Sequence, residues 1–174
     1  QTIAQNTIYD IVNTHPTAVV SLTGIHASYP ASGTNVVSRN FIHSLSINSS
    51  NNAGNIIGIN AFAGIATYHN NMIRLGIDAS GSAITTGYNI IGIQQSSATA
   101  NNFFYFNSIY IGGTGVSGNN NTYAYQRIAG TAATNLRNNI LFNERAHSAG
   151  TAFNYAVGLT ASTAVTSNYN IYKS

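Results

Sequence analysis

The chain has 174 residues, of which 3 are Asp or Glu and 6 are Lys or Arg, so 5% is charged, against about 25% in an ordinary soluble domain. Hydrophobic residues make up 44% of the chain, enough apolar surface to argue against a disordered polymer. The six cations are scattered, which argues against nucleic-acid binding. No apolar run approaches the ~18 residues that span a bilayer, and the absence of Cys excludes disulfides and thiolate sites.

The length predicts a single domain over residues 1–174. The chain opens with QTIAQ, without an initiating Met, a basic segment or an apolar segment of the signal-peptide type. We therefore expect either that a signal peptide has been removed or that the domain is a fragment of a longer solenoid.

A six-residue unit, apolar-x-x-Asn-x-apolar, recurs along the whole chain. Its asparagines are separated by 34, 31, 36 and 32 residues. A degenerate sixth copy at 165–170 keeps an asparagine at Asn168 and has Asn170 in place of the final apolar residue. The five regular copies are 3–8, 37–42, 68–73, 104–109 and 136–141, with the anchoring residues Asn6, Asn40, Asn71, Asn107 and Asn139.

A second unit has a glycine between strand-forming residues, and it alternates with the first in strict order. It occurs at 23–25, 57–59, 91–93 and 157–159, and the wider last interval leaves room for a divergent copy near 125–128. Two series in phase predict an internal repeat of about five coils.

The repeat predicts an all-β fold, a parallel β-helix or β-solenoid. Each segment is short, rich in Ile, Val, Tyr and Phe, and bounded by Gly, Asn, Ser or Thr, which favours strands over helices. Coils stacked ~4.8 Å apart would bury their apolar positions in continuous columns. We predict two inward columns, Ile8, Ile42, Ile73, Ile109 and Leu141, and Ile3, Val37, Tyr68, Phe104 and Leu136.

The repeated asparagine lies between these columns, where the chain must bend. Asparagine tolerates the left-handed backbone region and bonds to neighbouring backbone groups. Identical asparagines stacked coil on coil also exchange side-chain amide hydrogen bonds. We therefore expect a structural asparagine ladder.

The pattern I-x-x-N-x-I followed by a G-I strand resembles the right-handed parallel β-helix repeat of the pectate-lyase-like superfamily, particularly its bacterial secreted and cell-surface members. The coils here are longer than that family's common coil. The resemblance places the extra residues in long loops on one side of the solenoid, and we expect that side to be variable and accessible. The loops are 46–55, 78–89, 112–122 and 143–156.

Carbohydrate cleavage is the activity that this resemblance implies, and it depends on acidic groups. Glycoside hydrolysis normally uses two carboxylates ~5–9.5 Å apart. Asp10, Asp78 and Glu144 fall in the first, third and fifth coils, about 10 Å apart along the axis for each pair of intervals. We therefore expect no enzymatic activity, no catalytic residues and no cofactor. The histidines lack compact ligand spacing, and we expect no metal: His15, His26, His43, His69 and His147.

A column of mostly planar side chains directly follows the inward isoleucines. Alternation along the strand directs it outward, where it could bind sugar rings or another protein, or simply stack on itself. We take it as the candidate ligand or partner surface, formed by Tyr9, His43, Arg74, Tyr110 and Phe142. Ice binding would need a flat Thr or Ser array, and no Thr column recurs at one coil position.

The two ends of a β-helix expose unpaired strands that are usually covered, and neither end of this sequence contains an amphipathic helix. These features favour a non-enzymatic structural or adhesive protein, extracellular or on the cell surface, which self-associates through open ends into filaments. The alternative is a carbohydrate-binding or carbohydrate-active protein with glycan as its partner. Neither hypothesis involves nucleic acid or a membrane span.

Overall fold

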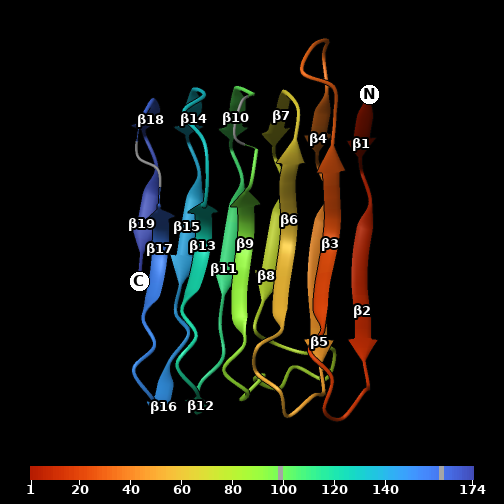
Figure 1. The fold of residues 1–174 in the computed structure, drawn as a ribbon, viewed down its shortest axis with the longest axis vertical. Helices are drawn as coiled ribbons and strands as arrows, with labels where there is room; N and C mark the ends of the chain where they lie inside the picture. Colours follow the sequence, from red (N-terminus) through yellow and green to blue (C-terminus); the bar gives the residue numbers. More distant parts are fainter. Residues whose placement is uncertain (98–99, 161–162) are drawn as a thin grey trace.

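The computed structural model describes residues 1–97, 100–160 and 163–174, and every regular element in these ranges is a β-strand. The strands repeat coil by coil, and Figure 1 shows the coils side by side from the N-terminus to the C-terminus. The first three coils contain β1 (Thr2–Ala4), β2 (Thr7–Asn13) and β3 (Ser21–Ser28); β4 (Val36–Ser38), β5 (Phe41–Ile47) and β6 (Asn55–Ala63); and β7 (Ala66–His69), β8 (Met72–Leu75) and β9 (Asn89–Gln95).

The remaining coils follow the same plan, with one short extra strand in each of the fourth and fifth. The fourth contains β10 (Asn102–Tyr105), β11 (Ser108–Ile111), β12 (Val116–Ser117) and β13 (Thr122–Arg127). The fifth contains β14 (Thr134–Arg137), β15 (Ile140–Asn143), β16 (His147–Ala149) and β17 (Asn154–Leu159), and a partial sixth contains β18 (Val165–Asn168) and β19 (Ile171–Lys173).

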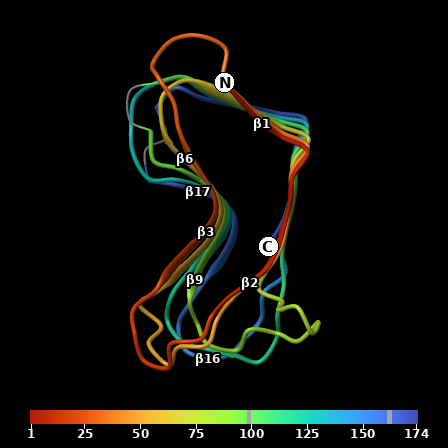
Figure 2. The same cartoon turned by 90° about the vertical axis from the view of Figure 1, so that its right-hand side faces the viewer.

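Corresponding strands of successive coils pair in parallel and form three long sheets. The first sheet has the order β1-β4-β7-β10-β14-β18, the second β2-β5-β8-β11-β15-β19, and the third β3-β6-β9-β13-β17. Figure 2 looks along the stack, where the coils superpose and the third sheet bows toward the interior at its middle. The predicted all-β parallel solenoid of about five coils is confirmed.

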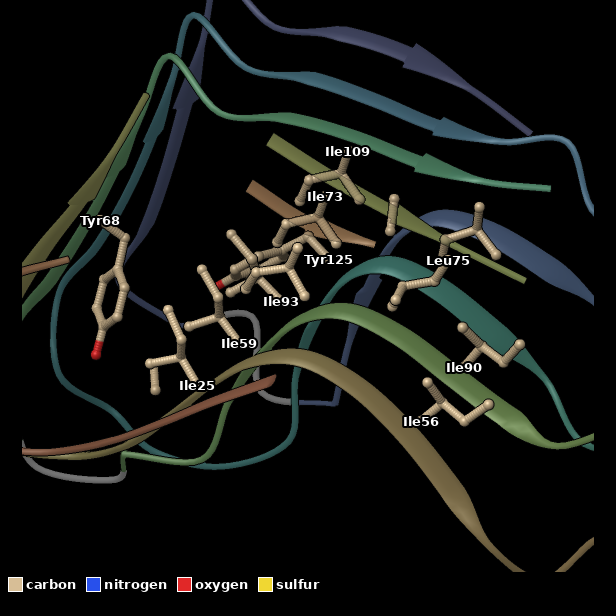
Figure 3. Close-up of a cluster of buried hydrophobic side chains, with 14 of the residues drawn as sticks. Ile25, Ile56, Ile59, Tyr68, Ile73, Leu75, Ile90, Ile93, Ile109 and Tyr125 are labelled. Carbon is tan, nitrogen blue, oxygen red and sulfur yellow. The ribbon is translucent and has the colours of Figure 1, made fainter. Parts of the chain in front are cut away.

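The core lies between the three sheets, and both predicted apolar columns face it. Ile42 and Val37 are fully buried, whereas Ile8 and Ile3 of the first coil are only partly covered. Figure 3 shows side chains of the second and third sheets meeting in the interior. The other column members, each at most 2% exposed, are Ile73, Ile109, Leu141, Tyr68, Phe104 and Leu136.

The bowed middle of the third sheet is built on a glycine column, Gly24, Gly58 and Gly92. A Cβ at Gly58 would lie 2.8 Å from Cγ2 of Ile73, and one at Gly92 would lie 2.4 Å from Cγ2 of Ile109. The glycines therefore allow the β-branched isoleucines of the second sheet to approach the backbone of the third.

The predicted alignment of 157–159 with this glycine column is wrong. Tyr123 pairs with Ile91 and with Tyr155, so the column continues through Ala124 and Ala156 rather than Gly158. Gly158 lies two residues further along the strand, opposite Gln126. A Cβ at Gly158 would lie 2.4 Å from Cδ1 of Tyr123, so the glycine makes room for that ring.

The long loops gather at one end of the cross-section, between the second and third sheets (Figure 2). We expected these loops to form a variable, accessible surface. Two of them contain regular structure, because β12 and β16 pair in parallel. Nδ2 of Asn120 also donates to the carbonyls of Asn52 (2.7 Å) and Gly87 (2.8 Å). These bonds tie together the loops of the second, third and fourth coils.

Candidate functional site

The asparagines at the bend between the first and second sheets form a ladder along the stack. Oδ1 of Asn107 accepts the backbone N–H of Asn71 at 3.1 Å and a side-chain N–H of Asn71 at 3.0 Å. The other Nδ2 hydrogen of Asn107 reaches back to the carbonyl of Tyr68 at 2.9 Å. The same pattern joins Asn6, Asn40, Asn71, Asn107 and Asn139 in order.

The sixth member of the ladder is Asn170, not Asn168. Oδ1 of Asn170 accepts the backbone and side-chain N–H groups of Asn139, both at 2.9 Å. Strand pairing places Asn168 beside Arg137 instead, outside the ladder. The last copy of the unit is therefore 167–172, two residues later than the sequence alignment.

The left-handed backbone at each bend belongs to the residue before the ladder asparagine, not to the asparagine itself. Phe106 has φ 56° and Arg39 has φ 54°. The asparagine contributes hydrogen bonds, and its neighbour adopts the conformation that L-residues rarely take. The equivalent residues in the other coils are Gln5, Asn70, Asn138 and Tyr169.

Arg127 is fully buried and is held only by carbonyl oxygens. Its Nε and Nη2 atoms donate to Ala129 (3.2 Å), Gly130 (2.8 Å) and Ala132 (2.8 Å), and Nη1 donates to Thr163 (2.8 Å). The planar guanidinium fork suits several acceptors at once. This arginine therefore holds the turn after β13 in place and cannot serve as a surface cation.

Arg145 plays a similar role among the loops. It is 3% exposed, and its guanidinium donates to the carbonyls of Gly112 (3.2 Å), Ile84 (2.7 Å) and Thr86 (3.1 Å). Burial lowers the pKa of Arg145 to about 10. The sequence identifies both arginines only as two of six scattered cations and does not predict their burial. The signal for Arg127 was its inward register, two residues after the buried Tyr125.

The outward column lies on the second sheet, and strand pairing aligns its five residues in chain order. We name it the planar strip: Tyr9, His43, Arg74, Tyr110 and Phe142. The rings of Tyr9 and His43 stack at 5.3 Å with 14° between their planes. Lys173 continues the strip in the partial sixth coil, with Nζ 5.8 Å from the ring centroid of Phe142.

A shallow groove of about 280 Å³ runs beside the planar strip. Met72 and Ile140 in its lining are 53% and 40% exposed, so the lining is mostly apolar, with Arg74 and Ser108 as its polar residues. The groove is lined by Phe41, Met72, Ile73, Arg74, Ser108, Ile109, Tyr110, Ile140 and Phe142.

A second outward surface lies on the concave outer face of the third sheet. The sequence did not reveal it, because the predicted alignment of the fifth coil was wrong. Tyr123 and Tyr155 stack there at 5.2 Å with 11° between their planes. They border a groove of about 400 Å³ with Gln126 and Thr160. Oε1 of Gln126 accepts from Nε2 of Gln94 at 3.2 Å. The groove lining is aromatic and apolar with the single amide of Gln126, and it carries no charge.

The three carboxylates lie in the first, third and fifth coils, as the sequence predicts. Oδ1 of Asp78 accepts from the Ser80 hydroxyl (2.7 Å) and the Ser82 N–H (2.9 Å), and these bonds lower its pKa. Glu144 pairs with Lys173. Within the described ranges no three His, Asp or Glu side chains gather as metal ligands.

The histidines lie apart from one another in the fold. His43 belongs to the second sheet beside Arg74, whereas His69 belongs to the first sheet beside Ser38 and Tyr105. Stacking therefore does not bring these two together. Nδ1 of His15 accepts backbone N–H groups of the turn that follows it.

Comparison of the chain with family models, curated proteins and solved structures found no significant match. The part of the chain that the structure describes contains no helix long and apolar enough to cross a membrane.

Proposed function

We propose that this protein is a non-enzymatic structural or adhesive solenoid, located outside the cell or on its surface, that assembles end to end into filaments. The observation that carries the proposal is the asparagine ladder, which repeats one bonding pattern from Asn6 to Asn170. Such a repeat is propagated by adding identical units, and stability then grows with the number of stacked coils.

The composition favours the same function. The net charge is +3 over 174 residues, so copies packed closely along one axis repel one another weakly. The proposal includes a right-handed coil, as in the pectate-lyase-like superfamily. Connections between parallel strands are generally right-handed, which supports this choice. The extracellular or cell-surface location rests on the resemblance to secreted bacterial β-helix proteins.

Electron microscopy of the purified chain at increasing concentration tests this proposal. We expect unbranched filaments one solenoid wide. Dispersed particles of monomer size at every concentration would overturn it.

Carbohydrate binding is a second candidate function, favoured by the groove beside Tyr123 and Tyr155. Aromatic rings beside amide side chains suit neutral sugars, whose hydroxyl groups bond to amides while their apolar faces pack on rings. The planar strip is the alternative surface for the same ligands. A glycan array should give hits that Tyr155→Ala weakens. An array without hits, or hits that this variant leaves unchanged, would argue against binding in the groove.

A further inference from the structure

A polar hollow of about 260 Å³, which we name the Asp78 hollow, lies among the loops of the second and third coils. It is bounded by the end of β5 and by the segment between β8 and β9, and both strands are paired on either side, inside the stack. It shares no lining residue with the two grooves described above. The polar residues of its lining are Ser46, Asn48, Asp78, Thr85 and Thr86.

Ser46 brings a buried hydroxyl to the Asp78 hollow. Its neighbours Leu45 and Ile47 point into the core, so alternation along the strand directs Ser46 outward, into the hollow. The residue is 5% exposed, and its hydroxyl makes no hydrogen bond to any described part of the chain. Because buried hydroxyls normally have a hydrogen-bond partner, this one is available to a ligand.

Asp78 contributes a carboxylate whose orientation is fixed by its own turn. Oδ1 accepts from the Ser80 hydroxyl at 2.7 Å and from the Ser82 N–H at 2.9 Å. The backbone closes the same turn, since the Asp78 N–H donates to the Ser82 carbonyl at 2.9 Å. Oδ2 accepts no hydrogen bond from the described residues. The carboxylate is therefore held in place with one oxygen free to accept from a ligand.

Arg145 holds another wall of the Asp78 hollow from two coils away. Its guanidinium donates to the carbonyls of Ile84 at 2.7 Å and Thr86 at 3.1 Å. The Ser117 N–H in β12 donates to the carbonyl of Thr85 at 2.9 Å, while the Thr85 hydroxyl has no partner in the described ranges. The wall is therefore preformed, which lowers the entropy that is lost when a ligand binds.

The charges at the Asp78 hollow favour a neutral ligand over a cation. Asp78 is the one charged residue of the lining, and the buried guanidinium of Arg145 is bonded to the wall from behind. A ligand in the hollow therefore meets two opposite charges that offset each other. A calcium ion needs about six to eight oxygen ligands, and two carbonyls that could contribute, those of Ile84 and Thr86, already accept from Arg145.

We propose that the Asp78 hollow binds one neutral pyranose ring, whose hydroxyl groups bond to Oδ2 of Asp78 and to the hydroxyls of Ser46 and Thr85. Each sugar hydroxyl both donates and accepts, so one ring can satisfy a carboxylate and several hydroxyls together. The exposed amide of Asn48 offers a further partner. A volume of about 260 Å³ suits a single ring. This inference is independent of end-to-end assembly and of the groove beside Tyr123.

Nuclear magnetic resonance of the dilute, ¹⁵N-labelled chain tests the proposal. The probes are the methyl glycosides of glucose, galactose, mannose and N-acetylglucosamine, added one at a time. We expect at least one of them to shift the amide signals of 46–48 and 78–86 in a saturable way. No shift at these residues with any probe would overturn the inference. Shifts confined to Tyr123 and Tyr155 would overturn it as well and would support the other carbohydrate site.

Asp78→Asn should weaken the binding of the active glycoside about tenfold or more, because hydrogen bonds to a charged acceptor are stronger than those to an amide. An amide oxygen at this position can still accept from Ser80 and Ser82. The matched control is Asp10→Asn, which removes the same charge in the first coil, where φ is 54° and asparagine is readily accommodated. The control should leave the affinity unchanged, and equal losses in the two variants would contradict the role of Asp78.

Ser46→Ala separates ligand binding from a structural role, since the Ser46 hydroxyl bonds to no described residue. We expect an undiminished melting temperature and an affinity lowered about threefold or more. Ser28→Ala, at the exposed end of β3, is the matched control and should change neither. An affinity that neither Ser46→Ala nor Asp78→Asn lowers would overturn the proposal.

Calcium chloride alone is the final probe of the Asp78 hollow. We expect it to leave the signals of 46–48 and 78–86 in place, because the hollow offers one carboxylate and the cation of Arg145 lies behind it. If calcium shifts these signals and the glycosides do not, the hollow is a cation site and the proposal is wrong.

Discussion

At the scale of single residues, the interior ladder asparagines are buried amides whose side-chain hydrogen bonds all cross between coils. Asn71, Asn107 and Asn139 are each 1% exposed. A buried polar group left without a partner costs about 1–3 kcal/mol. The ladder is therefore a source of specificity, because each asparagine fixes the register of two neighbouring coils.

Asn107→Ala should lower the free energy of unfolding by about 3 kcal/mol or more, since it leaves the Asn71 N–H and the Tyr68 carbonyl unpaired. The matched control is Asn6→Ala at the exposed edge, which should cost less than about 1 kcal/mol. Urea unfolding of dilute protein measures both. Equal losses at the two positions would contradict the importance of the interior ladder.

The residue before each ladder asparagine has the opposite property, since its backbone is strained and its side chain is dispensable. Phe106 has φ 56° and is 57% exposed. Phe106→Asn should raise the free energy of unfolding by about 0.5–1 kcal/mol, because asparagine accepts this conformation more readily. The reverse change in the next coil, Asn138→Phe, should lower it by a similar amount. Thermal unfolding compares the two, and a Phe106→Asn variant clearly less stable than wild type would refute this account of the bend.

At the scale of elements, the inward bow of the third sheet is limited by contact with the side chains of the second sheet. Glycine in one coil faces a β-branched isoleucine in the next, as Gly58 faces Ile73. By the same stagger, Ala124 faces Leu141, which has no methyl group on its Cβ. A smaller residue in the third sheet is therefore paired with a β-branched residue in the second sheet, and a larger one with an unbranched Cβ.

Gly58→Ala should destabilise the chain by about 1–3 kcal/mol through overpacking against Ile73. Ile73→Leu alone should cost less than about 1.5 kcal/mol. The double variant reproduces the Ala124 and Leu141 pair, and we expect it to recover at least about 0.5 kcal/mol relative to the sum of the single changes. A double-mutant cycle by urea unfolding measures the coupling, and strict additivity would contradict the pairing.

Much of this element arrangement could be predicted from the sequence, because the inward columns and the ladder repeat chemically similar residues. The register of Ile42, Ile73 and Ile109 can be predicted from the sequence alone, because the same residue recurs at the same position of each repeat. The last coils could not be aligned from sequence because similar residues there do not occupy equivalent positions. Gly158 makes room for the ring of Tyr123 instead of continuing the glycine column, and Asn168 lies two residues before the ladder residue Asn170. A search for sequence patterns aligns residues of the same type, whereas the actual register is set by which residues pair between neighbouring strands.

The candidate surfaces were predicted less completely. The planar strip follows from simple alternation after the isoleucines. The Tyr123 and Tyr155 groove depends on the corrected register of the fifth coil, and the pairing of β12 with β16 depends on contacts between loops that carry no repeat. Burial of Arg145 likewise depends on those loop contacts.

At the scale of the whole molecule, the scarcity of charge sets the response to pH. Tyr68 and Tyr125 are each at most 1% exposed, and burial raises the pKa of both above the ordinary value of 10. Above pH 10 the unfolded chain releases these protons while the folded chain retains them. The stabilisation is therefore complete below pH 10 and is lost as pH rises further.

We expect each tyrosine to remove about 1.4 kcal/mol of unfolding free energy per pH unit above pH 10. Arg145 acts in the opposite direction, because its folded pKa of about 10 is below its ordinary value of 12.5, but it is outnumbered, since burial raises the pKa of Tyr29 and Tyr88 as well. Tyr68→Phe should flatten the alkaline decline without destabilising the chain at pH 8, since the Tyr68 hydroxyl is buried with no partner among the described residues. Urea unfolding at pH 8 and pH 10.5 tests both statements, and equal alkaline slopes in the two proteins would contradict them.

The proposed assembly belongs to the same scale, and it would use both the ladder and the low charge. Each coil is stabilised by the coil on either side, so the outermost coils are the least covered. Ile8 and Tyr172 at the two edges retain the exposure that interior members of their column have lost.

Solution X-ray scattering over a concentration series tests the central claim of end-to-end assembly most directly, because it reports length and width separately. We predict that the forward scattering per unit mass rises with concentration while the cross-sectional radius of gyration stays constant. Forward scattering that does not change, or a cross-section that widens as copies associate side by side, would contradict the account.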